Sequence, residues 1–284
     1  MNSGTLISAP ALQRRLQTEE LLVVDCRHDL ADLARGAREY AQEHIPGAVY
    51  ADLQHDLSDL TKAGAGRHPL PDADAFSAVL GRWGWRSAMP VVAYDAANGA
   101  LAAARLWWML RLAGSSDVAV LDGGFAAWKA AGLPTSRELP QRVPTQVQIA
   151  FDAAQVVYTD ELRELQQNPQ LLLLDARAAP RYSGQTEPID AVAGHVPGAR
   201  NRPFSDNLGS DGRFKAAAEL RAEFAQLLGS HAPGDVVHMC GSGVTACHNL
   251  LAMEHAGLHG ARIYAPSWSG WISGRGNPVA TGSD

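Results

Sequence analysis

The stretch Leu21-Leu22-Val23-Val24-Asp25-Cys26-Arg27 recurs 150 residues later as Leu171-Leu172-Leu173-Leu174-Asp175-Ala176-Arg177. Two further pairs of stretches follow in the same order at a similar spacing: His44-Ile45-Pro46-Gly47-Ala48 with His195-Val196-Pro197-Gly198-Ala199, 151 residues apart, and Gly124-Phe125-Ala126-Ala127-Trp128 with Ser267-Trp268-Ser269-Gly270-Trp271, 143 residues apart. A period this long indicates duplication of a whole domain and not a series of short repeats.

Each half alternates short apolar runs with helical stretches. In the first half, Leu21–Asp25, Val91–Asp95 and Val118–Asp122 are typical of strands and Ala100–Ala113 is typical of a helix, and the second half repeats the pattern. Because the runs are apolar throughout instead of alternating, they belong to a parallel sheet that is buried on both faces. We therefore predict an α/β fold, a tandem duplication in which each half is a small parallel-sheet α/β sandwich, with ligands beyond the carboxyl ends of the strands.

The segment between the two copies is rich in proline and polar residues. Pro134, Pro140 and Pro144 fall in a stretch without clear periodicity, which is typical of an extended linker. We predict a first domain over residues 1–135, a linker over residues 136–150 and a second domain over residues 151–284.

Composition excludes several classes of protein. The chain of 284 residues is 46% hydrophobic and 19% charged, as expected for a globular protein, and its net charge of -6 argues against nucleic acid as a partner. Three cysteines are too few, and odd in number, for a disulfide framework, so we expect a reducing compartment. No stretch is long and apolar enough to span a membrane, and we predict a cytoplasmic protein.

The heptapeptide Cys240-Gly241-Ser242-Gly243-Val244-Thr245-Ala246 is the strongest functional signal in the chain. It lies between the apolar run Val236–Met239 and a helix-like stretch that begins at His248. A strand that ends on Cys and passes through glycines into a helix leaves several backbone N–H groups free to converge on the sulfur, and the helix N-terminus adds its positive end. Such a site favours the thiolate and makes Cys240 a nucleophile. The alternative is a buried strand cysteine beside a glycine turn.

The duplication supplies an internal comparison for Cys240. The run Val91-Val92-Ala93-Tyr94-Asp95 takes the place of Val236-Val237-His238-Met239-Cys240, so Asp95 stands where Cys240 stands. Only the second copy has the nucleophile at this position. We predict that the second half carries the chemistry and that the first is catalytically silent.

Two α/β halves, a His-Ile/Val-Pro-Gly-Ala motif in each and the loop from Cys240 to Thr245 resemble the two-domain rhodanese superfamily, closest to its mercaptopyruvate sulfurtransferases. The resemblance covers nearly the whole chain. It implies that the loop cysteine becomes a persulfide, that a sulfane sulfur is transferred to a thiol such as thioredoxin or to cyanide, and that no cofactor takes part. The backbone of Gly241, Gly243, Val244 and Thr245 would hold the outer sulfur.

The residues after the nucleophile bear on the sulfur donor. Family members specialised for thiosulfate carry basic residues directly after the Cys, whereas this chain has Gly241 and Ser242. A monocarboxylate thiol can be held by arginines further off, so the loop favours 3-mercaptopyruvate over thiosulfate. Arg181 matches the arginine that binds the substrate carboxylate in the mercaptopyruvate enzymes of this family. The family has a second such arginine, but this chain has Ile189 at that position. Arg200 or Arg202 could compensate for its loss.

The resemblance also implies a proton relay that joins the loop serine to a histidine and an acid of the first domain. Ser242 fits by position, and His68 lies in Arg67-His68-Pro69-Leu70-Pro71, which is similar to the family's His-x-Leu-Pro. The acid is Asp52 or, with a small shift in alignment, Asp56, and we favour Asp52.

Several other residues have plainer interpretations. His44 and His195 occur in both halves, as do Arg27 and Arg177, so we expect structural roles for them. Cys26 and Cys247 are expected to be inert core residues, and the spacing of His238, Cys240, Cys247 and His248 does not fit zinc, so we expect no metal.

Two other functions compete with sulfur transfer from a small donor. A phosphatase loop of the Cys-x5-Arg type needs an arginine where this chain has Ala246, which argues against phosphoryl chemistry. A persulfide carrier without a small-molecule donor stays open, because Ile189 departs from the family pattern.

Overall fold

The computed structural model describes residues 4–282, so the outer limits of the two predicted domains, residues 1 and 284, lie outside the described residues. The chain folds into two compact units. The first comprises the residues up to Asp59, Pro71–Asp152 and Ser210–Phe214, and the second comprises Leu60–Leu70, Ala153–Gly209 and the residues from Lys215 onward. Residues 137–150 of the predicted linker have no regular secondary structure. The predicted domain limits remain a prediction.

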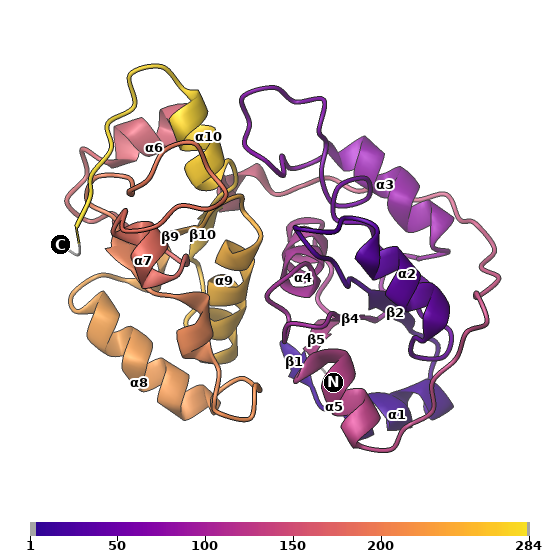
Figure 1. Cartoon of the computed structure of the whole chain (residues 1–284). Helices are drawn as coiled ribbons and strands as arrows, with labels where there is room; N and C mark the ends of the chain where they lie inside the picture. The colour runs from indigo at the N-terminus through magenta and orange to yellow at the C-terminus, as the bar shows by residue number, and fades with distance from the viewer. Residues whose placement is uncertain (1–3, 283–284) are drawn as a thin grey trace. The chain divides into compact units, whose positions relative to one another are not determined.

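The first unit is built on a five-stranded parallel sheet with the strand order β1-β5-β4-β2-β3 (Figure 1). Its strands are β1 (Leu6–Ile7), β2 (Leu22–Asp25), β3 (Val49–Tyr50), β4 (Val91–Tyr94) and β5 (Val118–Leu121). Its helices are α1 (Ala9–Thr18), α2 (Arg35–Gln42), α3 (Ala73–Arg82), α4 (Ala103–Leu112) and α5 (Gly124–Ala130).

The second unit repeats this sheet with the order β6-β10-β9-β7-β8, again parallel throughout. Its strands are β6 (Val156–Val157), β7 (Leu172–Asp175), β8 (Arg200–Asn201), β9 (Val236–Met239) and β10 (Arg262–Tyr264). Its α-helices are α6 (Thr159–Leu165), α7 (Ala179–Tyr182), α8 (Ala217–Leu228), α9 (Thr245–His255) and α10 (Ser267–Ser273). Three single 3₁₀ turns complete it: η1 (Ala153–Gln155), η2 (Phe204–Asn207) and η3 (Pro233–Asp235).

The predicted α/β fold and tandem duplication are confirmed, and even the strand register is repeated. Leu22 pairs with Val91 between β2 and β4, and Leu172 pairs with Val236 between β7 and β9. Strands β4 and β9 therefore occupy the same central place in their sheets. The loop that follows the carboxyl end of each is the position where ligands bind in sheets of this kind.

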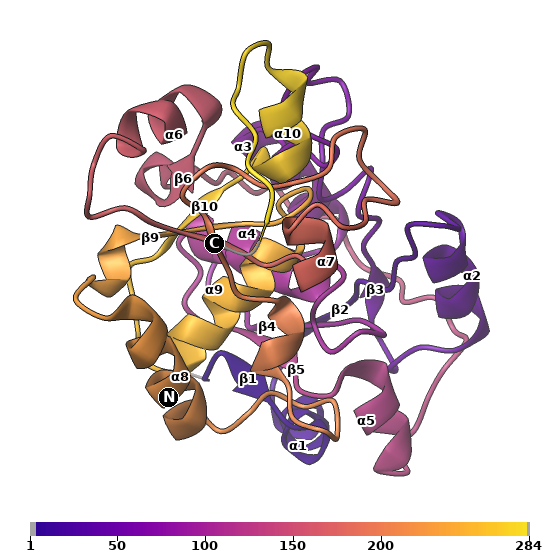
Figure 2. The same ribbon diagram turned by 60° about the vertical axis from the view of Figure 1, so that its left-hand side comes forward.

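Each sheet is covered on both faces, which explains why its strands are apolar throughout. In the first unit, α1 and α5 pack against each other and bury Leu12 and Trp128 on one face, while α4 lies on β4 and β5 on the other. In the second unit, α10 buries Trp268 and Trp271 on one face. Helix α9 covers β9 and β10 on the opposite face and packs along α8, as Figure 2 shows.

Two polar contacts recur in both units at the strand that precedes the His-Pro-Gly motif. Arg27 and Arg177 each pair with an aspartate two residues earlier, Asp25 and Asp175, at 2.6 Å. The repeated histidines donate through Nδ1 to a tyrosine carbonyl and stack on the same tyrosine: His44 on Tyr40, and His195 on Tyr182. These contacts hold the fold in both copies, whether the central strand is followed by Asp95 or by Cys240.

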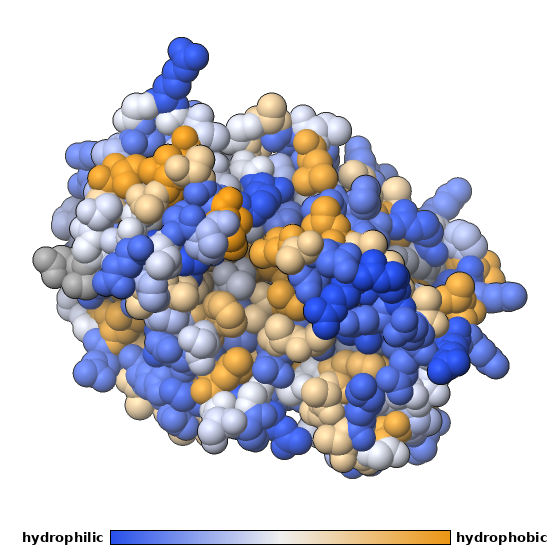
Figure 3. Space-filling view, in the orientation of Figure 1, coloured by the Kyte–Doolittle hydropathy of each residue, from blue (hydrophilic) through white to orange (hydrophobic). Residues whose placement is uncertain are grey.

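The surface mixes small apolar groups with hydrophilic side chains on the face seen in Figure 3. Among the described large hydrophobic residues, Val143 is 83% exposed and Leu139 is 65% exposed, and both lie in the segment without regular structure. No helix within residues 4–282 is long and apolar enough to cross a membrane.

The buried His238 gives the fold a dependence on pH. Its Nε2 lies 3.1 Å from Sδ of Met253, and burial lowers its pKa from 6.5 to about 3. The folded state keeps this imidazole neutral, whereas the unfolded chain takes up a proton below pH 6.5, so stability is complete above that pH and is lost as the pH falls toward 3. At pH 4.5 the loss from this one group is about 3 kcal/mol.

Lowering the pH from 7 to 4.5 should reduce the free energy of unfolding of the wild-type protein. We expect this reduction to be about 2–3 kcal/mol smaller in His238→Leu, measured by denaturant unfolding at both pH values. His55→Leu is the matched control, because the His55 side chain is 77% exposed. Equal acid sensitivity of His238→Leu and the wild-type protein would show that His238 is not the group responsible.

Candidate active site

Cys240 follows β9 directly and opens the loop that leads into α9. The residue is only 1% exposed, and its Sγ accepts a hydrogen bond from the backbone N–H of Gly243 at 3.2 Å. Gly243 has a φ of +77°, a conformation that favours glycine and that turns the loop back onto the sulfur. Val244 caps α9 and Thr245 is its first residue, so the positive end of that helix lies at the loop.

Helix α10 holds the first residues of this loop by backbone contacts. The N–H of Trp268 donates to the carbonyl of Cys240 and the N–H of Ser269 donates to the carbonyl of Gly241, both at 2.9 Å. The N–H of Cys240 donates to Oγ of Ser267 at 3.1 Å. Both the N–H and the carbonyl of Cys240 are therefore fixed by residues at the start of α10.

Ser242 and His68 meet, although 174 residues separate them in sequence. His68 belongs to the segment Leu60–Leu70 that folds with the second unit, and its Nδ1 lies 2.9 Å from Oγ of Ser242. Both side chains are buried. A hydroxyl and an imidazole in contact, two residues from a buried thiol, can pass a proton.

Two guanidinium groups lie over Gly241. A Cβ atom on Gly241 would stand 3.2 Å from Nη2 of Arg67 and 3.6 Å from Nη1 and Nη2 of Arg181. A side chain at this position would therefore press on the guanidinium of Arg67 and touch that of Arg181. Arg181 was anticipated from the sequence, whereas Arg67 was not.

Two buried acids hold these arginines in place. Asp190 bridges them, with Nη1 of Arg67 at 2.5 Å and Nη2 of Arg181 at 3.0 Å. Glu187 accepts from Nε and Nη2 of Arg181 at distances of 2.8–3.1 Å. Burial opposes ionisation of Glu187, but the hydrogen bonds from Arg181 and from the backbone of Asp190 and Ile189 outweigh it and leave the pKa of the carboxyl below its usual value.

The acids occupy only one edge of each guanidinium. Within residues 4–282, Nη2 of Arg67 and Nη1 of Arg181 donate to no protein acceptor, and Gly241 is the residue that both approach. Two N–H groups of fixed direction are therefore left beside the Cys240 loop. A carboxylate is the group that such a pair of donors suits.

The other arginines that were considered have different partners. Nη1 of Arg200 donates to the carbonyl of Leu227 in α8, and Nη2 of Arg202 binds Glu223 of α8 at 2.6 Å. Ile189 is 44% exposed, next to the bridging Asp190. In this chain the second guanidinium at the loop is that of Arg67, from a different segment.

The candidate acid Asp52 belongs to the first unit. Its Oδ1 accepts from the backbone N–H groups of Gln54 and His55 and lies 3.1 Å from Nδ1 of His55. The other candidate, Asp56, pairs with Arg82 and accepts from the N–H of Asp52, while burial raises its pKa.

The loop of the first unit shows what a cradle of this kind binds. Asp95 follows β4 as Cys240 follows β9, and its carboxylate accepts five backbone N–H groups: those of Ala97 and Gly99 at 2.8 Å, Leu101 at 3.1 Å, and Ala102 and Ala103 at 3.2 Å. The side chain is fully buried. The cradle of the first unit is thus filled by the chain's own anion.

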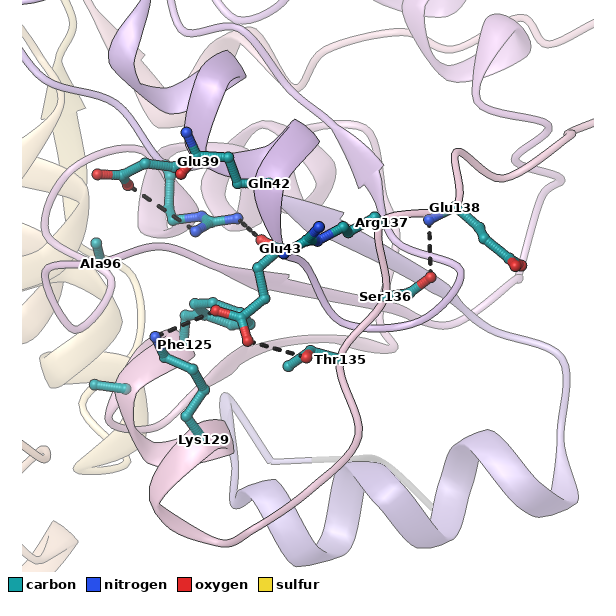
Figure 4. Close-up of a pocket in the computed structure, with 12 residues that line it drawn as sticks. Glu39, Gln42, Glu43, Ala96, Phe125, Lys129, Thr135, Ser136, Arg137 and Glu138 are labelled. Atoms are coloured by element: carbon teal, nitrogen blue, oxygen red, sulfur yellow. Dashed lines mark hydrogen bonds and ion pairs between the residues drawn. The ribbon is translucent and has the colours of Figure 1, made fainter.

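A cavity of about 960 Å³ lies beside this filled cradle in the first unit. Figure 4 shows Glu43 in its wall between Lys129, at 3.4 Å, and Thr135, at 3.0 Å. The lining includes three cations and three glutamates but no cysteine, serine–histidine pair or other activated nucleophile. The lining of this cavity therefore offers no candidate for the predicted nucleophile, whereas the Cys240 loop does.

The remaining cysteines are buried and reduced. Burial raises the pKa of the Cys26 thiol well above its usual value, and Sγ of Cys247 donates to the carbonyl of Gly243 at 3.3 Å. Among residues 4–282, no three His, Cys, Asp or Glu side chains gather as metal ligands would.

The sequence did not predict two residues beside Cys240, Arg67 and Ser267, although each could have been found from the sequence. Arg67 directly precedes His68, so a motif that places one side chain in the site also brings its neighbour near. Ser267 corresponds in sequence to Gly124, at the same 143-residue offset that aligns Trp271 with Trp128. The replacement of a glycine by a serine at this position was the signal in the sequence.

Comparison with known proteins agrees with this geometry. Residues 8–131 and 158–273 each match the model of the rhodanese-like domain. A Pseudomonas aeruginosa protein named "Probable 3-mercaptopyruvate sulfurtransferase" is 49% identical over 284 residues, which are 99% of this chain and 100% of the relative. A thiosulfate sulfurtransferase of Cricetulus griseus is 33% identical over 89% of this chain and 85% of its own length. The solved structure of 3-mercaptopyruvate sulfurtransferase from Leishmania major superimposes with a TM-score of 0.82 at 34% identity, covering 94% of this chain and 73% of that one.

The five bonds to Asp95 give a test of the first unit. We expect Asp95→Ala to lower the free energy of unfolding by about 2–4 kcal/mol, because buried N–H groups lose their acceptor. Asp32→Ala, at a side chain that is 47% exposed, should change it by less than about 0.5 kcal/mol. Denaturant unfolding measures both, and an equal, small effect would mean that the cradle does not depend on the carboxylate.

Proposed function

This chain is a sulfurtransferase of the rhodanese family, and we propose that it takes a sulfane sulfur from 3-mercaptopyruvate onto Cys240 and passes it to a thiol. The same loop serves both half-reactions. The second unit would carry the chemistry, and the first would be silent because Asp95 fills its cradle.

The observation that carries the choice of donor is the pair of guanidinium edges turned toward Gly241, Nη2 of Arg67 and Nη1 of Arg181. They would hold the carboxylate of 3-mercaptopyruvate with its thiol toward Cys240. The negative charges of Asp190 and Glu187 balance the positive charges of Arg67 and Arg181. This part of the site therefore suits a monocarboxylate better than the dianion thiosulfate, because the counterions for a dianion would have to come from the loop itself. Gly241 and Ser242 supply none.

In the first half-reaction, the Cys240 thiolate attacks the sulfur of 3-mercaptopyruvate. A sulfur–sulfur bond forms while the carbon–sulfur bond breaks, and its electron pair leaves with the carbon as pyruvate enolate. The enolate carbon then takes a proton and pyruvate departs. Cys240 is left as a persulfide, whose outer sulfur the backbone N–H groups of Gly241, Gly243, Val244 and Thr245 would stabilise.

We propose that the proton reaches the enolate through Ser242 and His68, and Asp52 remains the acid that the family resemblance implies for this relay. The contact of 2.9 Å between His68 and Ser242 supports the first two members of this relay. In the second half-reaction, an acceptor thiol attacks the outer sulfur and releases the Cys240 thiolate. Thioredoxin, or cyanide in vitro, would suit this step, and the reduced cysteines fit a cytoplasmic setting.

Parallel kinetics test the donor. We expect kcat/KM to be much higher for 3-mercaptopyruvate than for thiosulfate with a dithiol acceptor. Arg67→Met and Arg181→Met should each raise KM for 3-mercaptopyruvate about 10- to 100-fold, the cost of a lost charge-assisted hydrogen bond. Arg200→Met is the matched control, since its guanidinium binds Leu227 of α8. Preference for thiosulfate, or unchanged kinetics in Arg67→Met, would contradict the assignment.

The relay has its own test. We expect Ser242→Ala and His68→Gln each to lower kcat about 100-fold. The double variant should be little worse than either single one, because the two groups act as a unit. Stopped-flow measurement of pyruvate release gives the rate of the step concerned. Effects that multiply in the double variant would show that the two residues act separately.

A further inference from the structure

Ser267 has a backbone conformation that its residue type does not favour. Its φ is +53°, and among the described non-glycine residues it shares a positive φ only with Ala88 and Asn98. Ser267 is fully buried and is the first residue of α10. A non-glycine residue with a positive φ is strained, so other contacts must compensate for the strain. Such residues concentrate at functional sites.

The duplication shows that the conformation itself requires no serine. Gly124, at the corresponding position of the first unit, has a φ of +58°. The residue that follows makes the same contact in both units: Phe125 donates to the carbonyl of Asp95 at 3.0 Å, and Trp268 donates to the carbonyl of Cys240 at 2.9 Å. Glycine therefore suffices for the turn, and the serine of the second unit supplies something more.

The additional feature is a hydroxyl placed between the nucleophile and the neighbouring strand. Oγ of Ser267 accepts the N–H of Cys240 at 3.1 Å and donates to the carbonyl of Tyr264, at the end of β10, at 3.0 Å. Both bonds are buried, so each fixes its partner in direction as well as in distance. The hydroxyl thereby ties the backbone at Cys240 to the strand beside it.

We propose that Ser267 is a positioning residue for sulfur transfer: its hydroxyl fixes the main chain at Cys240 so that Sγ faces the N–H of Gly243. This inference rests on the proposed function of Cys240. The N–H of Cys240 is the first donor of the loop, and a rotation of its peptide would swing Cα–Cβ and move the sulfur away from the cradle. Ser267 would raise reactivity without touching the donor, whose carboxylate is held by Arg67 and Arg181.

The decisive variant is Ser267→Gly, which restores the residue of the first unit, removes the hydroxyl and relieves the backbone. We expect its melting temperature to stay close to that of the wild-type protein, because relief of the positive φ offsets part of the cost of leaving the N–H of Cys240 without its acceptor. Its kcat for 3-mercaptopyruvate should fall about 10-fold with KM unchanged, and alkylation of Cys240 by iodoacetamide should slow by a similar factor. Ser205→Ala, an exposed serine of the same unit, serves as the control and should leave all three values unchanged.

Ser267→Thr should affect stability and not catalysis. It keeps the hydroxyl but puts a β-branched residue at a positive φ, so we expect a lower melting temperature with kcat largely retained. Full kcat and a full alkylation rate in Ser267→Gly would overturn the proposal. The alkylation rate needs no sulfur donor, so a wild-type protein inactive with 3-mercaptopyruvate would refute the proposed function while leaving the role of Ser267 testable.

Discussion

The structure depends on one constraint: a loop that leaves the central strand of a parallel sheet and enters a helix turns its backbone N–H groups inward, and buried N–H groups require an acceptor. The two units answer this requirement differently. In the first, the carboxylate of Asp95 accepts five of these groups. In the second, Cys240 stands at the same place, and its sulfur accepts the N–H of Gly243. The same backbone therefore surrounds a structural carboxylate in one copy and, in the other, the thiol that we propose as the nucleophile.

The groups around Cys240 belong to three separate segments that the fold of the second unit brings together. Arg67 and His68 come from Leu60–Leu70, Arg181 comes from α7, and the loop itself follows β9. Asp190 ties the two arginines to each other at 2.5 and 3.0 Å. Because these opposite charges cancel, the specificity that we propose for this site would depend on the direction of the remaining N–H groups more than on net charge.

Much of this arrangement could be predicted from the sequence, because a duplication compares the chain with itself. The apolar strands, the position of Cys240 against Asp95 and the family resemblance were all readable, and they are confirmed in the fold and in the relatives. The features that the sequence did not predict depend on contacts between segments that are far apart along the chain. The sequence left Arg200 or Arg202 as possible replacements for the family arginine that is missing at Ile189. A guanidinium on a long side chain can come from any segment of the chain, and the second one beside Gly241 is that of Arg67. The backbone conformation of Ser267 likewise has no signature in a single copy of the motif.

The most direct test of the central claim is a single-turnover reaction of the full chain with 3-mercaptopyruvate and no acceptor, followed by intact-mass and peptide analysis alongside an assay of pyruvate. We expect each protein molecule to release one pyruvate and to gain the mass of one sulfur atom on the peptide containing Cys240, and we expect Cys240→Ser to do neither. Pyruvate release without a gain in mass, or sulfur found on Cys26 or Cys247 instead, would contradict this expectation.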